Sequence, residues 1–274
     1  MTQTKSTIIR VGREVIDVAK VNLTYDAAFT VALEDDPKVA KAILAPILQR
    51  SDFEVVSVHT HEESQSFRQR SVCFDCLAVF DDGTHCDIEM QKIKSRMPLE
   101  RMLFYRAMLR AGYSLEKGEA AFKRMTPAIV VVFLDGDFLD QGKPLYRFSY
   151  HDANTHEDME PGQGIYVANY RIRDTSTQLG RLMEDINASE PEKVYDSILC
   201  DALEMLKSDK GVKRMTEYME KVSEESAKAW LEQGMQQGKR ELLVALYKDN
   251  VITAEESARR LDIPVEEFLK LAGE

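Results

Sequence analysis

The sequence predicts an α/β fold: a mixed central sheet of about five strands with helices on both sides, followed by an all-helical C-terminal tail. Residues 70–92 alternate between polar and apolar side chains around a tight turn, as two paired strands do. Residues 127–134 form a continuous apolar run, typical of a strand that is buried on both faces of a sheet. Strand signals stop after about residue 190. We therefore expect a sheet domain over residues 1–190 and a helical region over residues 191–274.

The first elements of the chain read as two helices and a strand. Apolar residues recur at helical spacing over residues 26–49, and an acidic stretch that ends in Pro37 interrupts them. We expect Asp36 to cap the second helix with Pro37 at its first position, because a carboxylate accepts from free amide groups there and proline has none to satisfy. Residues 53–59 predict a strand, whereas residues 1–23 give no organised signal.

The register of the strand pair follows from its turn. Residues 81–83 form the loop, because their glycine supplies the positive φ that a short hairpin needs. A loop of three residues pairs Phe80 with Thr84 and brings Asp75 opposite Glu89. Side chains alternate between the two faces of a strand. The predicted core face carries Phe74, Cys76, Ala78, Phe80, Cys86, Ile88 and Met90. The opposite face carries Asp75, Asp87, Glu89 and Gln91, with Leu77, Val79 and His85 nearer the turn.

The three carboxylates on this second face call for a counter-charge. Neighbouring like charges repel one another, and partial burial strengthens the repulsion. Clustered oxygen atoms are the ligands that Mg²⁺ or Mn²⁺ prefers. A polar strand face is more often simply solvated. That alternative is weaker here, because the second strand has carboxylate, carboxylate and amide at alternate positions and the facing strand adds another carboxylate.

The rest of the chain reads as a helix, two strands and then helices only. These elements are predicted over residues 98–115 (helix), 146–150 and 165–170 (strands), 191–207 and 212–248 (helices) and 252–272 (a helix-turn-helix-like pair). Thr253 and Glu256 should form a capping box at the start of the pair. Gly234 and Gly238 should form a joint in the long helix, since glycine weakens a helix interior.

A set of short motifs is shared with one known family. The motifs are Phe74-Asp75, the turn Asp82-Gly83, the string Ile88-Glu89-Met90-Gln91 and, further out, residues 24–29 and 100–105. Together they resemble the signature of the PD-(D/E)XK nuclease family transposases, also called recombination-promoting nucleases. The resemblance covers about residues 20–190, and it implies a restriction-endonuclease-like sheet.

The resemblance also implies a function: a metal-dependent DNA endonuclease, which is a phosphodiester hydrolase, serving recombination or transposition. The implied residues are Asp75, Glu89 and Gln91 as catalytic residues, Asp75 and Glu89 as ligands of Mg²⁺ (or Mn²⁺), and Asp26, Asp87 and Lys92 as accessory residues. Gln91 stands where many relatives in the wider superfamily carry lysine, so which cation assists the reaction stays open. Two alternatives remain: an inactive nuclease fold that binds DNA, and a regulatory module that binds a protein partner.

The chain is acidic overall but basic beside the predicted site. A net charge of −11 at pH 7 is unusual for a DNA-binding protein, because phosphate contacts require cations. Residues 91–110, however, contain six basic residues and a single acidic one, and they begin at the end of the acidic strand. We expect Lys94, Arg96, Arg101 and Tyr105 to bind DNA. Arg101 has a second interpretation, as the partner of a site carboxylate.

Composition bears on compartment and assembly. No run of 18 apolar residues is present, the N-terminus lacks the apolar segment of a secretory signal, and four cysteines suggest no disulfide framework. These features predict a cytoplasmic protein without membrane contact. The apolar stripes of the tail must be buried somewhere, since isolated amphipathic helices are marginal in water. We expect a homodimer through the C-terminal helices, because double-strand cleavage requires two sites.

Overall fold

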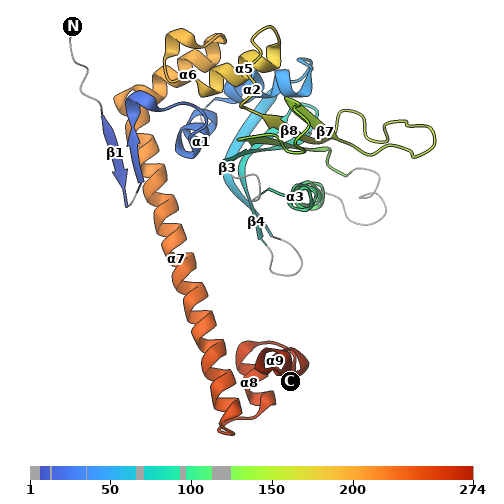
Figure 1. Cartoon of the computed structure of the whole chain (residues 1–274), viewed down its shortest axis with the longest axis vertical. Coiled ribbons are helices and arrows are strands. Elements are labelled where there is room, and N and C mark those ends of the chain that lie inside the picture. Colours follow the sequence, from blue (N-terminus) through green and yellow to red (C-terminus); the bar gives the residue numbers. More distant parts are fainter. Residues whose placement is uncertain are drawn as a thin grey trace. The chain divides into compact units, whose positions relative to one another are not determined.

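The computed structural model describes residues 7–273 apart from residues 13, 35, 66–70, 93–96 and 113–124. The chain divides into two compact units, Met1–Tyr218 and Met219–Glu274 (Figure 1). The first unit contains a sheet with helices on both faces, and the second contains helices. The predicted mixed α/β architecture with a helical C-terminal region is therefore confirmed.

The central sheet of the first unit has six strands in the order β3-β4-β5-β6-β8-β7, one more than expected. Their bounds are β3 Val55–Gln65, β4 Ser71–Phe80, β5 His85–Gln91, β6 Ala128–Leu134, β7 Leu145–Phe148 and β8 Gly164–Asn169. The pairs β5/β6 and β6/β8 are parallel, and the other three pairs are antiparallel. Every residue of β6 is buried, as the apolar run predicts for a central strand.

The hairpin of β4 and β5 has the predicted register. Cys76 pairs with Ile88, and the ladder continues to Val79 and His85 beside the turn. The Phe80 amide donates to the Thr84 carbonyl at 2.8 Å. Gly83 has φ +82°, the conformation that the short loop requires.

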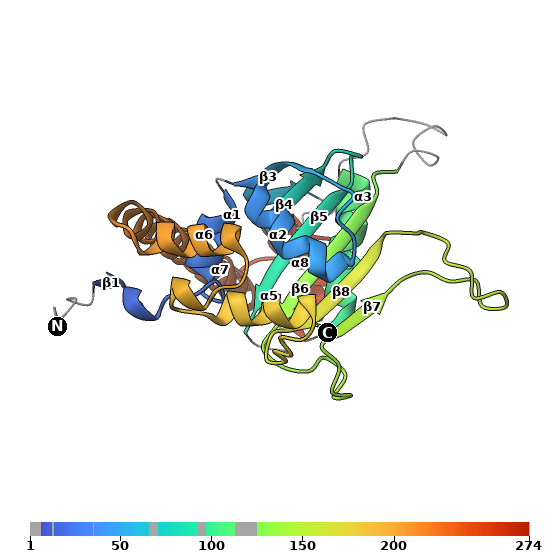
Figure 2. The same cartoon turned by 90° about the horizontal axis from the view of Figure 1, so that it is seen from above.

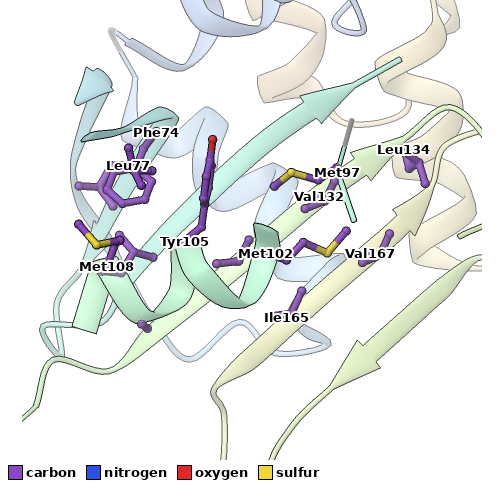
Figure 3. Packing of buried hydrophobic residues seen from close by; sticks show 14 of the residues in the cluster. Phe74, Leu77, Met97, Met102, Tyr105, Met108, Val132, Leu134, Ile165 and Val167 are labelled. Carbon is purple, nitrogen blue, oxygen red and sulfur yellow. The ribbon is translucent and has the colours of Figure 1, made fainter. Parts of the chain in front are cut away.

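The sheet is distorted where β3 passes Asp75. His61 of β3 has φ 52°, a left-handed conformation that is rare in a strand. It lies between the paired positions Thr60↔Cys76 and Glu62↔Phe74. The alternation of side chains changes there, because Phe74 packs in the same cluster as Leu77 (Figure 3). The prediction that Phe74 shares a face with Cys76 and Ile88 is therefore wrong.

Helices cover both faces of the sheet (Figure 2). Helices α1 (Asp26–Glu34) and α2 (Pro37–Leu48) lie on one face, where Phe29 meets Phe133 of β6 with ring centroids 6.0 Å apart. Helix α3 (Leu99–Gly112) lies on the other face and buries Met102, Tyr105, Met108 and Leu109. Asp36 caps α2 as predicted, accepting from the Lys38 amide at 2.9 Å.

Two further helices complete the first unit. Helix α5 (Gln178–Asn187), which the sequence patterns did not indicate, begins at a Thr177 cap. Helix α6 (Ser197–Lys207) packs on α1, α2 and α5. It buries three leucines, Leu199, Leu203 and Leu206. These leucines belong to the first compact unit, which ends at Tyr218. The domain boundary at residue 190 stays a prediction.

The N-terminal residues form a separate two-stranded sheet, in a region whose sequence shows no organised pattern. Strand β1 (Ile8–Val11) pairs with β2 (Glu14–Asp17), and a 3₁₀ turn, η1 (Val18–Lys20), follows. The ammonium group of Lys207 in α6 donates to the carbonyls of Val18 and Ala19 at 2.9 and 3.0 Å. A second 3₁₀ turn, η3 (Pro191–Lys193), takes the place of the first turn of the helix expected over residues 191–207.

The second unit is built from the end of helix α7 (Asp209–Lys248) and from α8 (Ala254–Leu261) and α9 (Val265–Ala272). Helix α7 runs without a break through Gly234 and Gly238. The helix is therefore not interrupted at the joint that the two glycines predict. Phe268 is buried among Leu243, Ala258 and Ala272. Within the described part of the chain, none of the helices combines the length and the apolar composition that a membrane crossing needs.

The predicted start of α8 is half right. Thr253 caps the helix and accepts from the Glu256 amide at 3.2 Å. The Glu256 side chain, however, reaches forward to Arg259 and Arg260 instead of back to the cap. Both arginines of the helix-turn-helix-like pair therefore have an acidic partner.

Candidate active site

Three predicted carboxylates gather at the end of the hairpin away from its turn. Asp87 and Glu89 lie on one face of β5, opposite Val130 and Val132 of β6. The backbone amide of Asp75 in β4 donates to Oε1 of Glu89 at 3.3 Å. The charge of Glu89 acts on both Asp75 and Asp87 and raises the pKa of each carboxyl group.

Burial of this cluster changes its acidity. Burial raises the pKa of Asp75 well above its ordinary value, and the charges of Glu89 and Asp26 raise it further. Burial, with the charges of Glu89 and Asp75, does the same to the pKa of Asp87. The pKa of Glu89 is raised by burial as well, although the amide of Asp75 and the charge of Arg101 oppose this change. The cluster therefore favours bound protons or a bound cation.

Asp87 has the strongest need for such a partner. Its side chain is fully buried, and both carboxylate oxygens lack a hydrogen-bond donor. A buried oxygen without a donor costs free energy that a cation or a proton recovers. The donor set, which consists of carboxylate oxygens, suits Mg²⁺ or Mn²⁺. The described side chains nevertheless include no group of three or more His, Cys, Asp or Glu residues arranged to hold a metal ion.

Gln91, Arg101 and Tyr105 surround Glu89. The Gln91 amide donates to Oε2 of Glu89 at 3.4 Å. Arg101 of α3 lies near enough to lower the pKa of Glu89 and Asp87, and its Nε donates to the Tyr105 hydroxyl at 3.1 Å. Tyr105 is 7% exposed, packs edge-on against Phe74, and has a pKa raised to about 12 by burial and by Glu89 (Figure 3). The geometry thus favours the second interpretation of Arg101, as a partner of the site carboxylates.

The first helix supplies another acid. Asp26 opens α1, and it is close enough to Asp75 to raise the pKa of that residue. The Tyr218 hydroxyl at the start of α7 donates to Oδ2 of Asp26 at 3.1 Å. The ammonium group of Lys92 lies 4.5 Å from the ring centroid of Tyr25, next to Asp26 in the chain. Asp26 therefore lies near Asp75, and Lys92 lies against the residue that precedes Asp26 in the chain. Their accessory roles stay a prediction.

The basic segment after β5 does not form one surface. Lys94 and Arg96 lie outside the described residues. Arg106 is buried, donates to the Ala128 carbonyl at 3.1 Å and shares Glu160 with Arg110. Arg106 and Arg110 therefore fasten α3 to the loop before β8, where both share the single carboxylate of Glu160.

The structure brings two further residues to the site that the sequence did not single out. The ring nitrogen Nε2 of His61 lies 2.8 Å from the Tyr218 hydroxyl, and the charge of His61 lowers the pKa of Asp75 against the raising effect of burial. From the sequence, His61 reads as the end of a strand. Tyr218 lies in a helix far along the chain, and no local pattern connects it with Asp26.

A cavity of about 590 Å³ lies elsewhere, among α2, α5 and α6. Its wall includes Pro46, Arg50, Arg181 and Asp185, and it contains none of the predicted site residues. The carboxylate cluster therefore remains the candidate active site.

Comparison with known proteins identifies a family for this chain. A family model described as PD-(D/E)XK nuclease family transposase matches residues 34–242, which include β4, β5 and α3. No curated protein and no solved structure matches the chain.

Proposed function

Because the chain belongs to the PD-(D/E)XK nuclease family transposases, we propose that it is a metal-dependent DNA endonuclease that promotes recombination or transposition. The family as a whole consists of nucleases that generally use a divalent metal ion. The observation that carries the proposal is the buried carboxylate cluster, in which both oxygens of Asp87 lack a donor. Such a cluster requires a counter-charge, and the cation that provides it would also serve the hydrolysis of a phosphodiester.

Asp75 and Glu89 are the proposed ligands of Mg²⁺ or Mn²⁺, with Asp87 and Asp26 as accessory acids. When bound, such an ion supplies Lewis acidity and a water molecule of lowered pKa. The residues of the chain provide the rest of the site. Gln91 can orient a water molecule through its amide but brings no charge.

Lys92 is the proposed cation for charge that develops on the phosphate, and Arg101 is proposed as the partner of the site carboxylates. Arg101 already faces Glu89 and Asp87, and its guanidinium is oriented by Tyr105. Lys92 follows Gln91 directly and borders Asp26 through Tyr25. Lys94 and Arg96 remain proposed phosphate contacts on the segment between β5 and α3. The absence of a lysine at position 91 is then compensated by cations from neighbouring positions.

We also propose DNA as the partner and a homodimer as the working assembly. Double-strand cleavage needs two sites, and Leu242 on α7 is 58% exposed and free to contact a second chain. A cytoplasmic location is likewise proposed, from the cysteine usage of the sequence.

Nicking of supercoiled plasmid, with and without Mg²⁺ or Mn²⁺, tests the proposal. We expect the wild-type protein to nick only with metal, and Glu89→Gln to reduce nicking to background while the circular dichroism spectrum is unchanged. Glu157→Gln, an exposed position in the loop before β8, is the matched control and should keep full activity.

The other outcomes separate the alternatives. Nicking by the Glu89→Gln variant would move the active site elsewhere. DNA binding without nicking in either metal would identify an inactive nuclease fold, and a failure to bind DNA would leave the regulatory module.

A further inference from the structure

The first turns of α7 contact both elements that flank the carboxylate cluster. Tyr218 donates to Asp26 at the start of α1, and its hydroxyl lies 2.8 Å from Nε2 of His61 in β3. The rings of Tyr218 and His61 lie 5.2 Å apart at a tilt of 43°. One hydroxyl thus joins a site acid to an imidazole on β3, the strand that pairs with β4 on either side of Asp75.

The backbone at His61 indicates that this contact has a function. A left-handed histidine inside a strand is strained, and such strain is retained at sites where the surrounding structure determines it. The distortion lies at the level of Asp75, between the pairs Thr60↔Cys76 and Glu62↔Phe74. The Tyr218 hydroxyl is hydrogen-bonded to the side chain of His61, the residue with this strained backbone.

Attachment of α7 to the first unit does not depend on this hydroxyl. Arg214, one turn earlier, forms an ion pair with Glu34 at the far end of α1, with 2.9 Å between Nη2 and Oε2. Met215 is fully buried beside it. Removing the Tyr218 hydroxyl should therefore leave the helix in place and change only what the hydroxyl touches.

We infer that Tyr218 is a positioning residue of the active site, which fixes the carboxylate of Asp26 and the imidazole of His61 beside Asp75. Helix α7 is then part of the nuclease site and more than a connection to the second unit. The inference rests on the proposed function for its role in catalysis. In metal sites, residues that hydrogen-bond to metal-binding side chains orient those side chains and their neighbours. We assign this role to Tyr218.

The test uses Tyr218→Phe in the full-length chain, with two readouts. We expect the affinity for Mn²⁺, measured by calorimetry, to fall about 10-fold, as it does when a residue behind a ligand is changed. We also expect the ¹⁵N resonances of the His61 imidazole to shift in the metal-free protein. His61→Asn assigns these resonances among the five histidines.

A matched control and a double variant make the test specific. Tyr146→Phe also removes a hydroxyl that bonds an aspartate, Asp137, but away from the cluster. It should change neither readout. If Tyr218 acts through Asp26, the variant Asp26→Asn/Tyr218→Phe should bind Mn²⁺ no more weakly than Asp26→Asn.

The outcomes separate this inference from the proposed function. Unchanged Mn²⁺ affinity in Glu89→Gln overturns the proposed metal site. Unchanged His61 resonances in Tyr218→Phe overturn the inference, whatever the metal result. Additive losses in the double variant would overturn the positioning of Asp26, because Tyr218 would then act on the metal site independently of that residue.

Discussion

Asp87 shows at the scale of one residue why this site should respond to pH. Its carboxyl group is fully buried beside two other acids and has no donor among the described residues. Because burial and the charges of Glu89 and Asp75 raise its pKa in the folded state, the folded protein holds a proton that the unfolded chain releases near pH 4. Its contribution to stability is present below that pH and is lost as the pH rises through the folded-state value.

We therefore predict that Asp87→Asn stabilises the metal-free protein at pH 7 but not at pH 4. The amide removes the buried charge and keeps the shape of the side chain. We expect the Tm at pH 7 to rise by about 2–4 °C for each kcal/mol gained, measured by calorimetry in EDTA. A difference in Tm that is the same at both pH values would contradict this account.

A second buried aspartate provides the control for that experiment. Asp185 accepts hydrogen bonds from the amides of Tyr195 and Asp196 at 2.6 and 3.1 Å. Asp185→Asn should lower the Tm at pH 7, because the amide group cannot replace both acceptors. The opposite signs of the two variants would separate an unsatisfied buried carboxylate from a satisfied one.

Arg101 provides a second prediction at the same scale. Since its charge lowers the pKa of Glu89 and Asp87, Arg101→Gln should raise the pH at which Mn²⁺ binding is half maximal. The slope of DNA affinity against salt should stay unchanged. Arg147→Gln, which breaks an ion pair with Asp158 in the β7–β8 region, is the control. An unchanged pH midpoint with a flatter salt slope would return Arg101 to phosphate binding.

Among the helices and strands, the β4–β5 hairpin positions most of the site acids. Asp75 lies on β4, Asp87 and Glu89 lie on β5, and Asp26 lies on α1. Its register depends on a three-residue loop that ends in Gly83, and a shift of one residue would turn Glu89 to the opposite face. The stability of the turn and the geometry of the site are therefore connected.

We predict that Gly83→Ala destabilises the protein by about 1 kcal/mol, because a side chain is strained at φ +82° although the space around it is open. Urea unfolding measures this change. Gly238→Ala is the matched control: it lies in the interior of α7 with nothing within 4 Å, and should stabilise the helix by about 1 kcal/mol. Equal stability of Gly83→Ala and wild type would contradict the assigned turn.

Across the whole chain, the first compact unit extends beyond the last strand of its sheet. Helix α6 buries three leucines on α1, α2 and α5, and α7 brings Tyr218 to Asp26. The first unit therefore needs the chain as far as the first turns of α7, and the family match extends past them as well.

Two truncations test this boundary. A chain ending at residue 224 should fold and bind Mn²⁺ like the full-length protein. A chain ending at residue 190 should not fold stably, because each buried leucine it loses contributes about 2–5 kcal/mol to a typical total of about 5–15 kcal/mol. A soluble, folded 1–190 fragment would contradict the assignment of α6 to the first unit.

Light scattering on the same samples tests the assembly. The full-length protein should be a dimer and the 1–224 chain a monomer, since the proposed contact uses the C-terminal helices. A monomeric full-length protein would remove the dimer.

Features that depend on near neighbours in the chain follow from the sequence alone. The three-residue turn fixes the register of β4 against β5, the apolar run fixes β6 at the centre of the sheet, and Asp36 with Pro37 starts α2. In each case the period of the side chains or the chemistry of a few adjacent residues decides the outcome. The motifs around Asp75 and Glu89 also identified the family that the match over residues 34–242 establishes.

Only the tertiary structure decided what the site contains besides these motifs. The contact between Tyr218 and Asp26 joins residues 192 positions apart, and Arg106 reaches Glu160 across 54 positions. The left-handed turn at His61 moves Phe74 to the face of Leu77 against the alternation of the strand. Such contacts depend on how complete helices and strands pack against one another. The spacing of apolar residues within one segment therefore does not reveal which distant side chain will hydrogen-bond to a buried acid or base.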